Sequence, residues 1–377
     1  MMLESLKAST IAIPFKTTFK HAAAARSATQ TFWVEVRGQD GSIGFGEGCP
    51  REYVSAESLS GAKAFFDAHR HEWLSSIRDL ASLVDWVARR RLEIDAKPAA
   101  WSAVELALLD LLGKTEGRSV ESLLGLAELE GSFRYTAVLG DATPPEFEAQ
   151  LARYQDAGFR QYKIKLSGDR VRDLAKVRIL KKAGVAPGAV RADANNLWAD
   201  ADVALRFLAK LDFPFFALEE PLRAGDYAGM QRIGLEFGAH IILDESLLRA
   251  DQLDRLVASP EQWLVNVRVS KMGGLLRSLD IVRAARRGGL KVIVGAHVGE
   301  TGLLSRAALT VASTARDILI GQEGAFGTHL LGYDLVEPQI MFGAAGILDV
   351  AALDIAGAPG FGLRLARVPS NVATSQF

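Results

Sequence analysis

From about residue 133 the sequence alternates between short apolar runs with strand character and amphipathic stretches with a helical pattern. The strand-like runs number eight and lie at 133–139, 161–166, 189–193, 215–219, 240–244, 263–269, 291–297 and 317–322. Repeated units of one strand and one helix are typical of a closed parallel barrel rather than an open sheet. The alternation therefore predicts an α/β fold with a TIM-type (β/α) barrel over residues 126–345.

Three of these runs end in a carboxylate at nearly equal intervals. Asp193 is followed after 26 residues by Glu219, and after a further 25 by Asp244. In a parallel barrel, groups at the carboxyl ends of successive strands converge on one face. A single carboxylate after a strand is often a helix cap, but three in register are hard to explain in that way. Three oxygen ligands predict a site for a divalent cation of the magnesium type.

Two lysines lie one strand earlier than the first carboxylate. Lys163 and Lys165 are two residues apart, so their side chains point the same way on a strand. Inside a barrel, two neighbouring ammonium groups would depress each other's pKa, and a lysine with a lowered pKa can act as a base near neutral pH. Two solvent-facing lysines on an edge strand are the alternative, which the carboxylate series on the following strands disfavours.

Residues 1–125 read as a separate α+β domain, because strands come first and helices follow. Residues 31–37 alternate between apolar and polar types and are followed by a Gly-Gln-Asp-Gly turn, which predicts an antiparallel hairpin. A helix is expected over 98–114, with Gly113 as its stop signal. After about residue 345 the alternation ends, and we expect the tail 346–377 to complete the first domain.

Bulk composition excludes several classes of protein. The 377 residues carry a net charge of -1, which gives no electrostatic footprint for nucleic acid. The single cysteine, Cys49, forms no intramolecular disulfide and fits a reducing cytoplasm. No apolar run approaches the roughly 18 residues of a membrane span, and the first residues lack a signal pattern. We therefore expect a cytoplasmic protein without a membrane or nucleic-acid partner.

The ordered set of motifs resembles the enolase superfamily, and most of all its muconate lactonizing enzyme-like subgroup. The motifs, in chain order, are Lys163-Ile164-Lys165, Asp193-Ala194-Asn195, Glu219-Glu220-Pro221, Asp244-Glu245-Ser246 and a basic residue five before Gly273-Gly274. The resemblance implies an N-terminal capping domain, a homo-oligomer and a small-molecule carboxylate substrate. It also implies Mg²⁺, with Mn²⁺ as the alternative ion, on Asp193, Glu219 and Asp244, and an enolate formed by removing the proton alpha to the carboxylate. Lys165 would be the base, and Lys163 would lower its pKa and help to hold the substrate carboxylate.

The sixth strand departs from the subgroup's pattern. Arg268 occupies the place of the lysine that stands opposite the first base, and an arginine stays protonated while binding anions with a fork of donors. Lys271 is the weaker substitute, and His297 at the end of the seventh strand is a second candidate acid or base. We therefore expect a reaction that needs one good base, unless His297 supplies another.

The expected function is Mg-dependent α-proton abstraction in a muconate cycloisomerase-like or related isomerase or lyase. The alternatives are an acid-sugar dehydratase, an amino-acid-derivative epimerase that uses His297, and a non-enzymatic relative that binds a carboxylate. Candidate substrate contacts are Asn195, Lys271, Glu300, Glu323, Tyr53 and His21.

Overall fold

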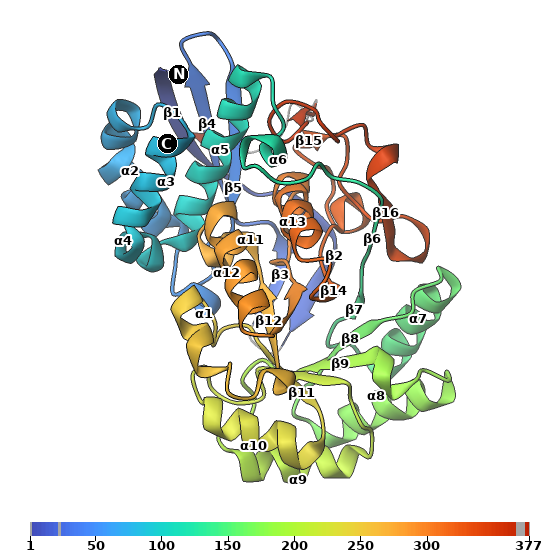
Figure 1. Cartoon of the computed structure of the whole chain (residues 1–377). Helices are drawn as coiled ribbons and strands as arrows, with labels where there is room; N and C mark the ends of the chain where they lie inside the picture. Colours follow the sequence, from blue (N-terminus) through green and yellow to red (C-terminus); the bar gives the residue numbers. More distant parts are fainter. Residues whose placement is uncertain (1, 22–23, 367–373, 377) are drawn as a thin grey trace.

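The computed structural model describes residues 2–21, 24–366 and 374–376. Figure 1 shows an N-terminal region of sheet and helices above a larger region in which helices surround a parallel sheet. The first region contains an antiparallel sheet in the order β18-β1-β4-β5. Its strands are β1 (Leu3–Ile11), β4 (Thr31–Gly38), β5 (Ile43–Gly48) and β18 (Thr374–Gln376). The hairpin predicted after residue 31 is confirmed, because β4 and β5 pair from Phe32↔Gly48 to Arg37↔Ile43.

A second hairpin and six helices complete this region. The hairpin pairs β2 (Pro14–His21) with β3 (Ala24–Ala28). The helices are α1 (Glu52–Ser55), α2 (Leu59–Ser76), α3 (Leu80–Arg89), α4 (Arg91–Ala96), α5 (Pro98–Glu116) and α6 (Val120–Leu123). Helix α5 lies directly on β5, where a Cβ atom at Gly46 would stand 1.8 Å from the carbonyl oxygen of Ala103. The expected stop at Gly113 is wrong: α5 continues to Glu116 and ends at Gly117, whose φ of +65° suits glycine.

The parallel sheet contains eight strands, in the order β14-β13-β12-β11-β10-β9-β8-β7. Their bounds are β7 (Ala137–Leu139), β8 (Tyr162–Lys165), β9 (Val190–Asp193), β10 (Ala217–Glu219), β11 (His240–Leu243), β12 (Trp263–Val267), β13 (Lys291–Val294) and β14 (Leu319–Gln322). The two end strands meet where the amide of Thr136 donates to the carbonyl of Gln322, at 2.8 Å. All eight predicted runs contribute a strand, and the α/β barrel prediction is confirmed.

Helices cover the outside of this sheet, as Figure 1 shows. They are α7 (Pro144–Asp156), α8 (Arg170–Lys182), α9 (Ala201–Leu211), α10 (Tyr227–Phe237), α11 (Val269–Met272), α12 (Leu275–Arg287) and α13 (Gly302–Thr314). The predicted strict alternation fails between β11 and β12. There the chain forms only the 3-10 turns η2 (Ala250–Arg255) and η3 (Pro260–Gln262).

The first predicted barrel run is also divided. Its first part forms β6 (Ser132–Arg134), which pairs antiparallel with β16 (Ile347–Asp349) of the tail, and only its second part enters the barrel as β7. The remaining short elements are η1 (Pro187–Ala189), η4 (Gly327–His329), β15 (Val336–Glu337), η5 (Ala344–Gly346), η6 (Val350–Ala352) and β17 (Arg364–Leu365).

The tail contacts both regions. Its strand β18 pairs with β1, and the amide of Phe361 donates to the Asp110 carboxylate on α5 at 3.0 Å. From the barrel side, the guanidinium of Arg306 on α13 donates to the carbonyl of Phe361 at 2.9 Å. The domain limits given above stay a prediction.

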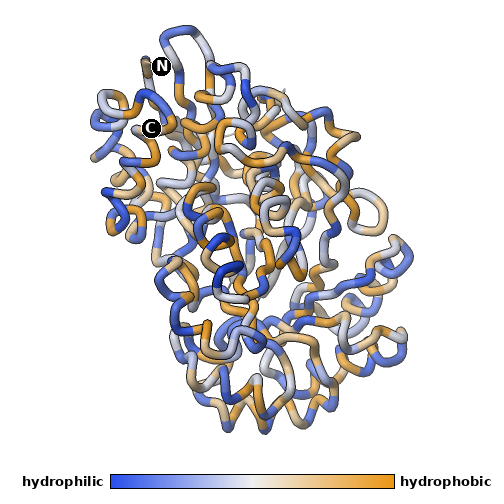
Figure 2. Tube along the Cα trace, viewed as in Figure 1, coloured by the Kyte–Doolittle hydropathy of each residue, from blue (hydrophilic) through white to orange (hydrophobic). Residues whose placement is uncertain are grey.

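A small apolar cluster fills the barrel interior beneath the strand ends. It consists of Ala217, Ile242, Leu264 and Ile293, one from each of four neighbouring strands, and is separate from the main core. Glu219 lies two residues after Ala217, so both side chains share the inner face of β10. The inner surface thus changes from apolar to charged toward the carboxyl ends of the strands. Figure 2 shows hydrophobic and hydrophilic residues interspersed along the whole chain. No helix among the described residues is long and apolar enough to cross a membrane.

Candidate active site

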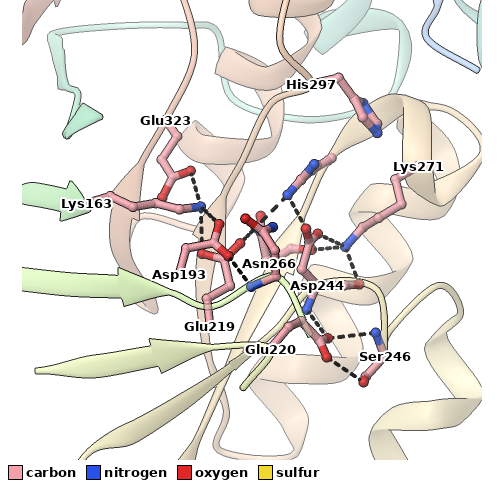
Figure 3. A network of polar contacts seen from close by, with 12 residues as sticks. Lys163, Asp193, Glu219, Glu220, Asp244, Ser246, Asn266, Lys271, His297 and Glu323 are labelled. Carbon is pink, nitrogen blue, oxygen red and sulfur yellow. Dashed lines mark hydrogen bonds and ion pairs between the residues drawn. The ribbon is translucent and has the colours of Figure 1, made fainter. Parts of the chain in front are cut away.

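The predicted charged residues gather at the carboxyl ends of the barrel strands. Lys165, Asp193 and Glu219 are the last residues of β8, β9 and β10. Asp244 and Arg268 each directly follow a strand, β11 and β12. Figure 3 shows Lys163, Asp193, Glu219 and Asp244 pointing toward one another, with Glu323 entering from beyond β14. The parallel register explains this convergence, because β8 pairs Lys165 with Asp193 and β9 pairs Asp193 with Glu219.

Lys163 is enclosed by three carboxylates. Its Nζ lies 2.6 Å from Glu219, 3.0 Å from Glu323 and 3.1 Å from Asp193. Burial alone would lower the pKa of this ammonium group, but the three carboxylates outweigh burial and raise the pKa well above its ordinary value. The expected depression of the Lys163 pKa is therefore wrong, and Lys163 is a firmly held cation.

Lys165 lies nearer the open end of the barrel. Its side chain is 10% exposed, compared with 3% for Lys163. Nζ of Lys165 donates to Oδ2 of Asp193 at 2.5 Å and to Oδ1 of Asn195 at 3.1 Å. Asn195, expected to contact substrate, therefore lies beside the proposed base. Its backbone amide also donates to Asp193, at 3.0 Å.

The three predicted metal ligands are linked by shared cations. Lys163 Nζ lies between Asp193 and Glu219, and Nη2 of Arg268 contacts Asp244 and lies 3.7 Å from Glu219. Burial and the neighbouring Asp193 carboxylate raise the pKa of Glu219 to about 7. Asp193 behaves in the opposite way: burial is outweighed by Lys165 and Lys163, and its pKa falls to about 2.

The donor set suits a hard divalent cation, because all three side chains offer carboxylate oxygens in a buried, converging arrangement. In the described part of the chain no three His, Cys, Asp or Glu side chains stand together as a metal-binding group. The carboxylates are paired with ammonium and guanidinium groups instead. Ligation of Mg²⁺ by Asp193, Glu219 and Asp244 stays a prediction that the donor chemistry fits.

Arg268 and Lys271 both contact Asp244 but differ in how many of their hydrogen-bond donors are used within the protein. Arg268 donates from Nη2 to Oδ2 of Asp244, and its Nε has no hydrogen-bond partner among the described residues. Lys271 donates at 2.8 Å to Oδ1 of Asp244, to the carbonyl of Asp244 and to the carbonyl of Asn266. An ammonium group has three donors, so every donor of Lys271 is used within the protein. Substrate contact by Lys271 stays a prediction, which this geometry disfavours.

His297 follows β13 and is buried beside Glu300. Its Nδ1 lies 3.2 Å from Oε1 of Glu300, and its backbone amide donates to the same oxygen at 2.7 Å. Burial, together with the nearby Arg268 and Arg51 guanidinium groups, lowers the pKa of His297 well below its ordinary value. Burial raises the pKa of Glu300 to about 8. Both side chains are therefore uncharged at neutral pH, and the lowered pKa makes the imidazole a weak proton acceptor.

Glu323, an expected substrate contact, lies in the charged site but not beside His297 and Glu300. It contacts Lys163, and its other oxygen lies 3.0 Å from Arg191. Arg191 was missed by the sequence reasoning. Its position two residues before Asp193 on β9 could have revealed it, because residues two apart on a strand share a face.

The remaining expected substrate contacts come from the N-terminal region. Tyr53 lies on α1, with the guanidinium carbon of Arg26 5.7 Å from its ring centre. His21 is the last residue of β2, and its side chain lies outside the described part of the structure. Arg51 joins this region to the barrel, since it donates to the carbonyls of Gln30 at 2.9 Å and of Val298 at 3.1 Å. Substrate contact by Tyr53 and His21 stays a prediction.

A layer of buried polar groups supports the charged site from behind. Glu220, which has a positive φ of 41°, accepts from the amides of Asp244 and Ser246 at 2.7 Å and from the Ser246 hydroxyl at 2.9 Å. Nδ2 of Asn266 donates to Oε1 of Glu219 at 3.2 Å. Figure 3 shows both groups adjoining the carboxylates.

Comparison with known proteins agrees with this architecture. Residues 6–125 match the family described as the mandelate racemase / muconate lactonizing enzyme N-terminal domain, and residues 146–367 match the enolase C-terminal domain-like family. The L-Lys-D/L-Arg epimerase of Methylococcus capsulatus is 29% identical over 88% of this chain and 90% of its own length.

Two solved structures are similar over nearly the whole chain. A dipeptide epimerase from Methylococcus capsulatus, complexed with Mg and the dipeptide L-Arg-D-Lys, is 27% identical with a TM-score of 0.81, covering 96% of this chain and 99% of that one. Muconate lactonizing enzyme from Pseudomonas putida is 26% identical with a TM-score of 0.80, covering 97% of each chain. These relatives are epimerases and a lactonizing enzyme, which supports an enzyme; the expected muconate cycloisomerase-like subtype is not confirmed. The two family matches together span most of the sequence, and the chain belongs to the enolase superfamily, in its mandelate racemase/muconate lactonizing enzyme group.

Proposed function

We propose that this protein removes the proton alpha to the carboxylate of a small-molecule substrate, with Lys165 as the base. The reaction would be of the isomerase or lyase type and would require one base. Asp193, Glu219 and Asp244 would hold Mg²⁺, an ion present in the related dipeptide epimerase structure. When bound, Mg²⁺ supplies positive charge that stabilises the negative charge developing on the substrate carboxylate.

The residues of the site have different roles in the proposed reaction. Lys165 Nζ accepts the α-proton from the substrate face that looks toward β8, and Asn195 helps to orient that nitrogen. Lys163 stays protonated and keeps Asp193, Glu219 and Glu323 together at the floor of the site. Burial of these groups excludes water, so the electrostatic contribution of each charge is larger than in solution.

The one-base proposal is supported by the side chain opposite Lys165. Arg268 stands at the end of β12, and its guanidinium is held against Asp244. An arginine stays protonated near neutral pH, so it is suited to binding an anion rather than to acting as an acid or base. Lys271 has no donor left for this task. These contacts favour an outcome in which the enolate loses a leaving group or is reprotonated from the side of Lys165, as in cycloisomerisation or dehydration.

Epimerisation of an amino-acid derivative is the second candidate. It is supported by the position of His297 after β13, at the carboxyl ends of the barrel strands, and by the epimerase relatives. In this version His297 would serve the substrate face that Lys165 does not reach. A non-enzymatic carboxylate-binding relative remains the third alternative. Cytoplasmic location and a homo-oligomeric state also stay predictions.

Exchange of the substrate α-hydrogen with solvent deuterium tests the proposal. The purified protein with Mg²⁺ should exchange the α-hydrogen of at least one member of a panel of acid sugars, dipeptides, N-acylamino acids and muconates, followed by proton NMR. Lys165→Ala should abolish exchange and leave Mg²⁺ binding intact, whereas Lys182→Ala, which changes an exposed lysine, should have no effect. Unchanged exchange in Lys165→Ala would rule out this base. Binding without exchange across the panel would favour the non-enzymatic alternative.

His297→Asn separates the first two candidates. If Lys165 is the sole base, this variant retains exchange with the active enantiomer. If the protein is an epimerase using His297, exchange is lost for one enantiomer only.

A further inference from the structure

A buried lysine behind the barrel wall contacts the backbone of the proposed base. Lys176 lies on α8, and its side chain is 1% exposed. Its Nζ donates to the carbonyl oxygen of Lys165 at 2.8 Å, to Oδ1 of Asp141 at 2.9 Å and to Oδ1 of Asp173 at 3.0 Å. These three acceptors use all the donors of the ammonium group.

The Asp173 carboxylate connects Lys176 to the turn that follows β8. It accepts from the amide of Ser167 at 3.0 and 3.1 Å, from the Ser167 hydroxyl at 2.9 Å and from the amide of Gly168 at 3.1 Å. Gly168 has a φ of +76°, a conformation that glycine adopts without strain. The first residues after the strand are therefore fixed by the same buried ion pair that reaches the carbonyl of Lys165.

The backbone of Lys165 is thus held from two directions. On the sheet side, the amide of Leu166 donates to the carbonyl of Asp193 at 2.9 Å. On the helix side, Lys176 binds the carbonyl of Lys165. A lysine side chain is long and flexible, so the position of its terminal nitrogen depends on how firmly its backbone is fixed. A displacement of about 1 Å at a reacting group can reduce a rate by about a hundredfold.

The stability of the fold does not by itself explain why a charged residue, Lys176, lies on the buried face of α8. Its neighbours on the inner face of α8, Val177 and Leu180, are apolar and buried. A buried ion pair is often no more stabilising than well-packed apolar side chains of similar volume. Lys271 repeats the arrangement on the other side of the barrel, where it binds the carbonyls of Asp244 and Asn266.

We propose that Lys176 is a positioning residue that holds the backbone of Lys165 so that its Nζ meets the substrate α-proton. The inference rests on the proposed function, because it assumes that Lys165 is the base. Lys176 is buried, and its three donors bind Lys165, Asp141 and Asp173, so no donor is left for a substrate or a proposed metal ligand. Its contribution should therefore appear in the rate of proton transfer rather than in binding.

Lys176→Met is the direct test, since methionine keeps much of the volume and removes the donors. We expect kcat and the rate of deuterium exchange to fall about 10- to 100-fold while KM changes less than about threefold. Mg²⁺ affinity, measured by calorimetry, should be unchanged, because Lys176 touches none of Asp193, Glu219 or Asp244. The matched control is Lys182→Met on the same helix, where the side chain is 78% exposed and the rate should not change.

Removing Lys176 leaves the buried Asp173 carboxylate without its cationic partner, so this variant could fail to fold. A second pair of variants avoids that difficulty, because Asp141 pairs with both Lys176 and Arg172, at 2.9 Å in each case. Asp141→Ala removes one acceptor of Lys176 and should lower kcat about 3- to 10-fold with KM little changed. Arg172→Ala leaves the contacts of Lys176 in place and should retain the full rate.

Each outcome supports or overturns the inference. A folded Lys176→Met or Asp141→Ala variant with an undiminished exchange rate would overturn it, as would equal losses in Asp141→Ala and Arg172→Ala. A rise in KM without a fall in kcat would place Lys176 in substrate binding and would also overturn it. If Lys165→Ala still exchanges deuterium, the proposed function fails first. If only Lys165→Ala loses exchange, the base assignment stands and the positioning role does not.

Discussion

Gly295→Ala should weaken Mg²⁺ binding although residue 295 contacts no carboxylate. Gly295 follows β13, and a Cβ atom built there would lie 2.1 Å from Oδ1 and 3.0 Å from Cγ of Asn266. No real contact is that short, so the Asn266 side chain has to move. Asn266 donates to Oε1 of Glu219 at 3.2 Å, and this bond would be lost. Gly295→Ala is therefore expected to disturb the proposed metal site by displacing the side-chain amide of Asn266.

The magnitude follows from the type of bond that is broken. A hydrogen bond to a charged group contributes about 1.5–3 kcal/mol, and about 1.4 kcal/mol corresponds to a tenfold change in a dissociation constant. We therefore expect the Mg²⁺ dissociation constant to rise about 10- to 100-fold, the range typical of residues that support a metal ligand.

Calorimetric titration with Mg²⁺ measures the effect without any substrate. Asn266→Ala removes the same bond directly and should give a similar loss. The double variant should bind no more weakly than Asn266→Ala alone, because the two changes act through one contact. Gly188→Ala is the matched control, since a Cβ atom there meets nothing within 4 Å. Normal Mg²⁺ affinity in a folded Gly295→Ala protein would refute the reasoning.

Two further predictions concern the opposite side of the site. Arg268→Lys should raise KM about tenfold because the fork of donors is lost, and an unchanged KM would contradict the anion-binding role. Chiral analysis of the product would show epimerisation if the new amine returns a proton. Glu300→Gln should alter the pH dependence of stability, because the pKa of Glu300 is about 8 in the folded protein and about 4.3 in an unfolded chain. The wild type should lose stability relative to the variant as pH rises from about 4.5 to about 8, by at most about 1.4 kcal/mol per pH unit. Denaturant unfolding at a series of pH values measures this difference, and a difference that does not vary with pH would contradict it.

The barrel strands and their terminal carboxylates were predictable because they follow from period and spacing. Ala217 and Glu219 show why: alternation places both on the inner face of β10, the apolar residue deeper and the carboxylate at the strand end. The route from β11 to β12 was not predictable in the same way. Two 3-10 turns stand there in place of a helix. The number and spacing of the strands do not indicate which kind of element connects two of them.

Charges were harder to predict than positions. The sequence indicates that Lys163 and Lys165 share a face, and this favours mutual repulsion. The structure adds Glu323, which lies 160 residues from Lys163 along the chain and 3.0 Å from its Nζ. A pKa depends on the sum of all nearby charges, and most of those charges come from other strands. The direction of the Lys163 pKa shift therefore depends on contacts between distant parts of the chain, which the spacing of nearby residues does not indicate.

The choice of Lys165 as base gains support from counting the donors of four lysines near the strand ends. Lys176 and Lys271 each bind three oxygen atoms, including backbone carbonyls, so neither nitrogen is available to substrate. Lys163 is surrounded by three carboxylates, which favour its charged form. Lys165 has two oxygen partners and the most exposed side chain of the four, at 10%. A base has to meet the substrate, and among these four lysines Lys165 has the most exposed side chain and the fewest protein oxygen partners.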